Sequence, residues 1–235
     1  MRNSIFILGL LVLVFSCSPS EQELFDEGIS LLESSQLEKS IEYFDRVIKK
    51  NPANTSAQNA KGVALFQLKK YDAAIGAFSQ SIAADSSSYK PFFNRGNAYL
   101  EKKAFKEAVL DYNRANGLDP SVLDIQYNRG LALLGLEEYE DAIFDFEQVI
   151  QDDPNHVLAH FNKAKAQLGN NDPVAAANSL VTTVTLDNRN GAAYYLLGVT
   201  QMSAFGQKEE GCANLKMALG LGFSEAKSWL DDFCK

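Results

Sequence analysis

The stretch that decides the fold is Tyr89–Val122, which reads YKPFFNRGNAYLEKKAFKEAVLDYNRANGLDPSV. Its first half places one small and two aromatic residues at i, i+4 and i+7, on one helical face: Phe92, Gly96 and Tyr99. A polar turn follows, and Ala108 and Tyr112 then repeat the i, i+4 step. Pro120 ends the second segment, because proline cannot continue a helix. The stretch therefore predicts two short amphipathic helices joined by a turn.

The same pattern recurs every 34 residues along almost the whole chain. Each period carries a small residue at position 8, another at position 20 and a large apolar residue, mostly aromatic, at position 24. The expected repeats are residues 21–54, 55–88, 89–122, 123–156, 157–190 and 191–223, followed by a capping helix at 224–235 with Ser224 as its N-cap. Since each repeat packs only on its neighbours, the sequence predicts a solenoid.

This spacing, together with a proline at position 32, resembles the tetratricopeptide repeat (TPR) pattern. Position 4 departs from the family, because its large tryptophan-like residue is replaced by Leu24, Gln58, Phe92, Gln126 and His160. The resemblance implies an all-α fold, a right-handed superhelix of antiparallel helix pairs. The segment Gly211–Leu230 also resembles the terminal unit of Sel1-like repeats. In repeat 5 the run Val181–Thr185 favours a strand by itself, and the surrounding period predicts a helix.

The first residues resemble a bacterial lipoprotein leader. Arg2 precedes the apolar run Ile5–Phe15, which is too short to span a bilayer as a mature helix. Ser16-Cys17 resembles the end of a lipobox, although Phe15 is bulky for one. This resemblance implies a signal peptide at 1–16, lipidation of Cys17, a short linker at 17–20, and attachment to the outer membrane, facing the periplasm. The alternative is an ordinary secretory signal with an incidental cysteine.

Charge restricts the possible partners. The chain carries −8 overall and −9 after Ser16, because the leader removes one positive charge, Arg2. A surface of this sign repels phosphate backbones, so a nucleic-acid partner is not expected. The sequence also contains no glycine loop of the kind that cradles phosphates, and no cofactor is predicted.

The outward positions of the first helices carry a regular set of side chains. Position 6 repeats asparagine, position 5 is mostly aromatic, and position 9 is mixed. In TPR families the first helices line the concave surface, and the asparagine row resembles the asparagine ladder of O-GlcNAc transferases. The expected peptide- or protein-binding residues are Phe93, Asn94, Asn97, Tyr127, Asn128, Leu131, Phe161, Asn162 and Lys165. Alternatively, the aromatics pack against neighbouring helices and the asparagines are merely solvated.

Charged pairs recur between the two helices of one repeat. Arg95 and Asp111, and likewise Arg129 and Asp145, are 16 residues apart. The expected role is structural ion pairing, with little value for each pair if it is exposed. Alternatively, Asp111 reaches forward to Arg129.

The histidines offer a metal-binding alternative. His156 and His160 are spaced i, i+4, which lets two imidazoles share a metal ion. No glutamate of the HExxH kind lies between them, and position 4 is a packing position, so neither a metal nor a catalytic residue is predicted. The leading hypothesis is a non-enzymatic, membrane-anchored adaptor in envelope protein assembly. Its alternatives are a spacer without a specific ligand and a metal-dependent hydrolase that uses these histidines.

The last two cysteines are expected to form a disulfide. Export brings Cys212 and Cys234 into an oxidising compartment, and lipidation of Cys17 leaves an even pair. The break at Gly220–Gly222 folds one helix back on the other and brings the two cysteines to the same level. The alternative is two small buried residues that never bond.

Overall fold

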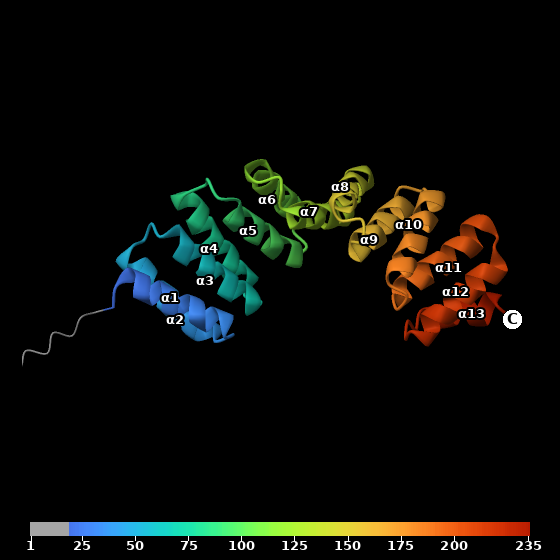
Figure 1. The fold of residues 1–235 in the computed structure, drawn as a ribbon, viewed down its shortest axis with the longest axis horizontal. Coiled ribbons are helices and arrows are strands. Elements are labelled where there is room, and N and C mark those ends of the chain that lie inside the picture. Colours follow the sequence, from blue (N-terminus) through green and yellow to red (C-terminus); the bar gives the residue numbers. More distant parts are fainter. Residues whose placement is uncertain (1–18) are drawn as a thin grey trace, which may run out of the picture.

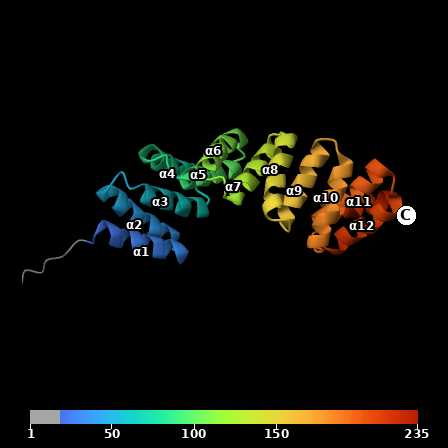
Figure 2. The same cartoon turned by 45° about the horizontal axis from the view of Figure 1, so that its top comes forward.

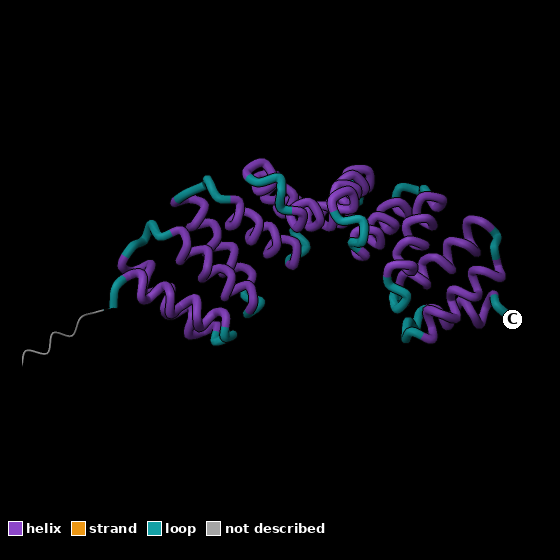
Figure 3. The backbone as a smooth tube through the Cα atoms, in the orientation of Figure 1, coloured by secondary structure: helices purple, strands orange, loops and turns teal. Residues whose placement is uncertain are grey.

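The computed structural model describes residues 19–235, so the predicted signal peptide and Cys17 lie outside the described residues. Between residues 19 and 235 the chain forms 13 α-helices and no strand, which confirms the all-α prediction (Figure 3). The first helices of the six repeats are α1 (Glu21–Glu33), α3 (Thr55–Gln67), α5 (Tyr89–Glu101), α7 (Leu123–Gly135), α9 (Val157–Gly169) and α11 (Gly191–Phe205). The second helices are α2 (Leu37–Lys50), α4 (Tyr71–Ala84), α6 (Phe105–Leu118), α8 (Tyr139–Asp152), α10 (Pro173–Leu186) and α12 (Lys208–Gly220), and α13 (Ala226–Phe233) follows them.

Each first helix begins at the first residue of its predicted repeat, and in every one except α7 the side chain of the preceding residue caps it. A side chain at that position accepts a hydrogen bond from a backbone N–H in the first turn, where the helix supplies no acceptor of its own. These caps are Ser20, Asn54, Ser88, His156 and Asn190. The 34-residue period is therefore marked at its boundaries by capping chemistry as well as by the core.

Every turn between the helices of repeats 1 to 5 contains one left-handed residue. It stands at position 15 each time, with φ between 57° and 62°: Ser35, Lys69, Lys103, Glu137 and Asn171. Two backbone hydrogen bonds stabilise this conformation. In repeat 4, the Glu137 N–H donates to the Leu134 carbonyl and the Glu138 N–H donates to the Leu133 carbonyl. In repeat 6 the left-handed residue is Gly206.

Close packing between the two helices of a repeat explains the glycine at position 8. Phe146 of α8 is fully buried against Gly130 of α7, where an added Cβ would lie 2.8 Å from the ring. Gly28 meets Phe44, Gly62 meets Phe78 and Gly96 meets Tyr112 in the same way. A large ring at position 24 thus fills the space that a missing side chain at position 8 leaves open.

The helix pairs stack into an arch (Figures 1 and 2). From α1 to α9, each first helix contacts the second helix of its own repeat and also the first helix of the next repeat. Successive second helices contact one another less. In Figure 1, α6 and α8 lie on the outer side of the arch and α7 lies beneath them. Within residues 19–235, no helix combines the length and apolar character that crossing a bilayer requires.

Repeat 5 confirms that the period outweighs local strand propensity. Val181–Thr185 lies within α10, where Thr183 is fully buried. Its hydroxyl donates to the Ser179 carbonyl at 2.8 Å, and Thr182 and Thr185 make the equivalent bond to the residue four before them. These bonds satisfy the hydroxyl groups inside the helix.

The C-terminal unit follows the sequence prediction except in its last cap. α11 has 15 residues against 13 in the other first helices, and the turn after it is one residue shorter, so repeat 6 holds one extra residue before its second helix. Cys212 and Cys234 are joined by a disulfide with their Cα atoms 5.7 Å apart, so α13 folds back on α12. The expectation that Ser224 caps the last helix is wrong: α13 begins at Ala226, and the Ser224 hydroxyl contacts the Glu225 carboxylate instead.

Candidate functional site

The predicted groove residues lie on α5, α7 and α9, the first helices of repeats 3 to 5. Lys165 is exposed, and most of the others are half-buried, so each shows part of its side chain to solvent. Most of the predicted set is therefore partly accessible on the first helices of three successive repeats.

The asparagines at position 6 reach back to the preceding repeat. Asn94 Nδ2 donates to Oδ1 of Asn59 at 3.0 Å, and Asn128 Nδ2 donates to Oδ1 of Asn97 at 2.9 Å. Asn97 also accepts from the Tyr112 hydroxyl at 2.8 Å. The row is thus a chain of cross-repeat hydrogen bonds, not a set of merely solvated amides.

This chain still leaves polar groups for a ligand. Among the described residues, Oδ1 of Asn94, Oδ1 of Asn128 and Nδ2 of Asn97 have no protein partner. The two free acceptors stand one repeat apart in the sequence, with the free donor between them, and an extended peptide backbone offers partners for both kinds of group.

Asn162 departs from the prediction that it faces the groove. Its side chain is 7% exposed, and Nδ2 donates both to the Tyr127 hydroxyl and to the Leu158 carbonyl, each at 3.0 Å. Because both amide hydrogens bond within the protein, Asn162 serves the contact between α7 and α9. The ligand-facing part of α9 is reduced to Phe161 and Lys165.

The position-5 aromatics pack partly against the second helices, the alternative that the sequence left open. Phe93 lies 6.1 Å from the Tyr112 ring, and Tyr127 lies 5.9 Å from the Phe146 ring. Lys165 places its ammonium 5.8 Å from the Phe161 ring. Phe93 and Tyr127 are thus each packed against a buried ring of the same repeat, and all three aromatics stay half-buried.

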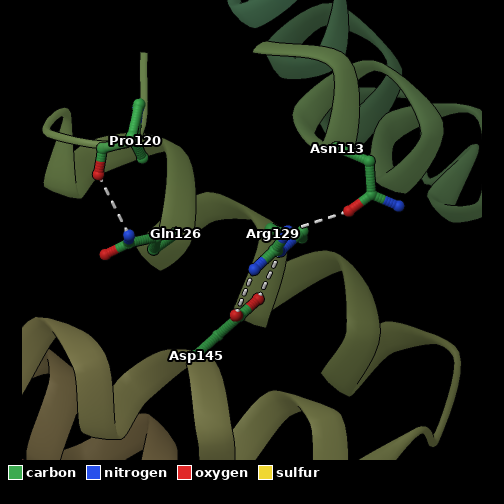
Figure 4. Close-up of polar contacts among 5 residues, drawn as sticks. All are labelled: Asn113, Pro120, Gln126, Arg129 and Asp145. Atoms are coloured by element: carbon green, nitrogen blue, oxygen red, sulfur yellow. Dashed lines mark hydrogen bonds and ion pairs between the residues drawn. The ribbon is translucent and has the colours of Figure 1, made fainter. Parts of the chain in front are cut away.

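Arg95 and Arg129 each bond to two successive second helices. We call the set of bonds that one of these arginines makes an arginine bridge. Arg129 donates to both carboxylate oxygens of Asp145 on α8, at 2.8 and 2.6 Å, and to Asn113 on α6 at 2.8 Å (Figure 4). Arg95 makes the same contacts with Asp111 and with Ser79. The pairs therefore form within a repeat, and the alternative Asp111–Arg129 pairing does not occur.

These pairs are more buried than the sequence suggested. The carboxylates are 5% and 1% exposed in Asp111 and Asp145. The hydrogen bonds to Asp111 raise the pKa of Arg95, and those to Asp145 raise the pKa of Arg129. Each guanidinium is held charged and oriented, and its charge is matched locally by one carboxylate.

The unusual residues at position 4 acquire a role that the sequence pattern did not reveal. Gln126 Nε2 donates to the Pro120 carbonyl at 3.3 Å (Figure 4), and Gln58 Nε2 donates to that of Pro52 at 2.7 Å. His160 Nε2 contacts the Pro154 carbonyl at 3.0 Å. The signal was present in the sequence, because position 4 is polar where a proline stands six residues before it and apolar in Phe92, where none does.

The two histidines are engaged separately. His156 Nδ1 accepts the Ala159 N–H at 3.0 Å as the cap of α9, and its ring lies 5.1 Å from Tyr127. His160 binds the Pro154 carbonyl, as described above. Within residues 19–235, no group of three or more His, Cys, Asp and Glu side chains is arranged to hold a metal ion. Each histidine has one ring nitrogen at a backbone group.

Family models match most of the repeat region. A tetratricopeptide repeat model matches residues 25–89 and 127–185, and a TPR repeat model matches residues 96–137. These are repeat families whose fold is a scaffold for protein–protein interaction, and no enzyme family is among them. Among curated proteins, no sequence matches the chain.

Solved structures resemble most of the arch. YrrB, described as a TPR protein with an unusual peptide-binding site, gives a TM-score of 0.67 at 20% identity, covering 76% of this chain and 91% of YrrB. PilF of Pseudomonas aeruginosa gives 0.71 at 17% identity, covering 88% and 96%. MamA of Desulfovibrio magneticus RS-1 gives 0.69 at 18% identity, covering 74% and 99%. These likenesses concern the fold, and together with the repeat models they give the conclusion that the chain belongs to the tetratricopeptide repeat family.

Proposed function

We propose that this protein is a non-enzymatic adaptor that holds a protein or peptide partner in the groove lined by α5, α7 and α9. The partner lies along the half-exposed stripe of Phe93, Tyr127 and Phe161. Its backbone bonds to the amide groups of Asn94, Asn97 and Asn128. YrrB, a TPR protein with an unusual peptide-binding site, supports the proposal by analogy of fold.

The observation that carries this proposal is the combination of packed, half-buried rings and uncommitted amide groups on the first helices of successive repeats. Phe93 and Tyr127 are each backed by a buried ring of the same repeat. A ring that is already fixed loses little conformational entropy when a partner packs against it. Leu131, between the two rows, adds half-buried apolar surface.

The adaptor is placed at the bacterial outer membrane, anchored by lipid at Cys17 and facing the periplasm, where it serves envelope protein assembly. The apolar run Ile5–Phe15 followed by Ser16-Cys17 supports this part of the proposal. The acidic composition is in keeping with a lipid anchor, because an acidic surface is not attracted to anionic lipids. The Sel1-like character of the C-terminal unit stays a prediction as well.

Affinity capture from the protein's own membranes tests the groove. Leu131→Ser combined with Lys165→Glu changes one half-buried and one exposed side chain of the groove, and circular dichroism checks that the variant is folded. The captured partner should be lost. Lys106→Glu, on an exposed position of α6, makes the same charge change away from the groove and is the matched control. A partner that is lost only with Lys106→Glu, or that withstands both changes, contradicts the groove proposal.

Detergent-phase partitioning tests the anchor. Cys17→Ala should leave the protein in the aqueous phase or uncleaved, whereas the parent should enter the detergent phase. If the variant partitions like the parent, the lipid anchor is excluded, while the groove proposal stands or falls separately by the capture experiment.

A further inference from the structure

A hollow of about 350 Å³ opens between the second helices α6 and α8, over α7 as its floor. We call it the outer hollow. Arg129 and Leu133 form the floor, and Val109 and Asn113 of α6 form one wall. The other wall consists of α8 and the turn before it: Glu138, Asp141, Phe144 and Asp145.

The outer hollow faces away from the groove. Successive residues of a helix are turned by about 100°. On α7, the groove residues Tyr127, Asn128 and Leu131 therefore span about 100°, and Arg129 and Leu133 centre on the opposite side. A partner in the groove and a partner in the outer hollow can be bound at the same time.

The wall on α8 exposes an aromatic ring. Phe144 is 57% exposed, although it lies on a helix whose inner ring, Phe146, is fully buried. Leu133 is 6% exposed at the bottom, and Val109 is half-buried at the side. The cavity thus offers an apolar seat for one side chain beside an exposed ring.

The rim is negatively charged. Arg129 is paired with Asp145 through the arginine bridge, and within residues 19–235 Glu138 and Asp141 at the edge form no ion pair. Both also line an adjoining hollow of about 320 Å³, together with Glu137 and Glu140. The apolar seat is therefore continuous with a shelf of four carboxylates.

The gaps on either side lack this combination. In the preceding gap, between α4 and α6, Tyr99 stands where the outer hollow has Leu133, and Ala104 stands where it has Glu138. Leu110, 69% exposed, is the counterpart of Phe144. In the following gap, Lys163 pairs with Glu147 at 2.9 Å, and Asn178 stands in place of Phe144.

We propose that the outer hollow is a second docking site, which takes a polypeptide segment that presents one aliphatic side chain flanked by lysine or arginine. The aliphatic side chain fills the space over Leu133 beside Phe144. The flanking cations lie on the carboxylate shelf, where charge complementarity selects them against acidic segments. The commitment to a basic partner follows from the sign of the shelf.

Fluorescence anisotropy tests the proposal with a labelled synthetic peptide, Gly-Ser-Gly-Lys-Lys-Leu-Lys-Lys-Gly-Ser-Gly, and the full-length chain in detergent. Phe144→Ala should weaken binding about tenfold, as expected for an apolar anchor. Leu133→Tyr, which copies Tyr99 of the preceding repeat, should fill the seat with a similar loss. Glu138→Gln with Asp141→Asn should weaken binding about threefold to tenfold at low salt.

Matched controls separate this site from other surfaces. Leu110→Ala changes an equally exposed apolar residue one repeat earlier and should leave affinity within about twofold of the parent. A peptide with every lysine replaced by glutamate should not bind. Equal weakening by Leu110→Ala and Phe144→Ala overturns the proposal, and so does an unchanged affinity of Phe144→Ala. Weakening only by Lys165→Glu would place the peptide in the groove, and a self-association that Phe144→Ala abolishes would assign the surface to a second copy.

If Leu133→Tyr does not fold, Phe144→Ala still decides the question. Its side chain is mostly exposed, so its removal should leave the circular dichroism spectrum and the melting temperature unchanged. The groove experiment uses other residues and another readout, so failure of one site is distinguishable from failure of the other.

Discussion

The regular middle of the arch and its C-terminal end solve the same packing problem with different chemistry. In repeats 3 and 4, a buried ring at position 24 lies over a glycine, and an arginine bridge links neighbouring second helices. In repeats 5 and 6, Leu180 and Leu215 replace the rings. At the position of Asp145 these repeats have neutral side chains instead: Ser179 donates to Gln167 and Asn214 donates to Gln201. Lys163, at the position of Arg129, pairs with the half-exposed Glu147.

The difference shows how the last helices of the solenoid are held in place. In repeats 3 and 4, the arginine at position 7 finds acceptors on the second helix of its own repeat and on that of the preceding repeat. A terminal repeat has a neighbour on one side only. There the disulfide between Cys212 and Cys234 fastens the last helix in place of a following repeat.

Removing one arginine bridge should show the largest effect. Arg129→Met leaves the buried carboxylate of Asp145 without a partner and should destabilise the protein by about 3 kcal/mol or more. Lys163→Met is the matched change at position 7 of repeat 5, where the Glu147 side chain is 49% exposed, and should cost less than about 1 kcal/mol. Urea unfolding followed by circular dichroism measures both. Equal losses would mean that the two regions do not differ in this respect.

The loss at Arg129 should depend on pH. Burial raises the pKa of Asp145, and the hydrogen bond from Arg129 opposes this rise. Without Arg129, the folded-state pKa should exceed the unfolded value of about 4. Protonation then favours the folded state, so the deficit of Arg129→Met should be smaller near pH 4 and should grow as pH rises. A deficit that is constant between pH 4 and pH 7 contradicts this.

Opening the C-terminal closure should come next in size. Cys212→Ser with Cys234→Ser frees a loop whose ends are 22 residues apart and should cost about 3 kcal/mol. Reductant should destabilise the parent by a similar amount and leave the double variant unchanged. Non-reducing mass spectrometry of exported protein checks the bond itself, and two freely alkylatable thiols would contradict it.

Replacing the Gly130–Phe146 packing pair of repeat 4 by the alanine–leucine pair of repeat 5 should have an intermediate effect on stability. Gly130→Ala brings a Cβ to 2.8 Å from Phe146 and should cost about 1–3 kcal/mol. Combining it with Phe146→Leu copies the Ala164–Leu180 pair of repeat 5 and should recover part of the loss. Gly117→Ala, which meets nothing within 4 Å, is the control and should stabilise by up to about 1 kcal/mol. Thermal melting compares the variants; a Gly130→Ala protein as stable as the parent would contradict the packing pair.

The smallest effect is expected at the turns. Glu137 adopts φ 62° in the middle, where the end repeat has Gly206. Glu137→Gly should therefore stabilise by about 0.5–1 kcal/mol, since a side chain is disfavoured in this conformation. Glu140→Gly, on the exposed face of α8, should instead destabilise by about 1 kcal/mol. A melting temperature that falls with both changes would contradict the role of the left-handed residue.

The sequence predicted the fold well because the 34-residue period carries the buried face. The residues that repeat, such as Gly96 with Tyr112, are those whose contacts lie within one repeat and depend only on helical geometry. The start of α13 was predicted wrongly because it depends on the turn before the helix. In this turn the Phe223 N–H donates to the Ala218 carbonyl, and the 34-residue period does not determine that contact.

The groove was predicted less completely. Periodicity assigns Asn94, Asn128 and Asn162 to one face, but it does not give the distance between neighbouring helices. That distance decides whether an amide meets solvent or the adjacent repeat, so the burial of Asn162 required the structure. Likewise, the position-4 residues looked like departures from the family pattern until their contacts with proline carbonyls were seen.

The arginine bridges have a consequence for how the arch opens. Arg95 joins α4 to α6, and Arg129 joins α6 to α8, so α6 is tied to a neighbour on each side. Thermal fraying that starts at either end must separate a buried ion pair before it reaches this helix. The backbone amides of α6 should therefore exchange with deuterium most slowly. The arch should therefore unfold from its two terminal repeats toward α6. A force applied at either end should likewise separate the terminal repeats before it separates the helices around α6.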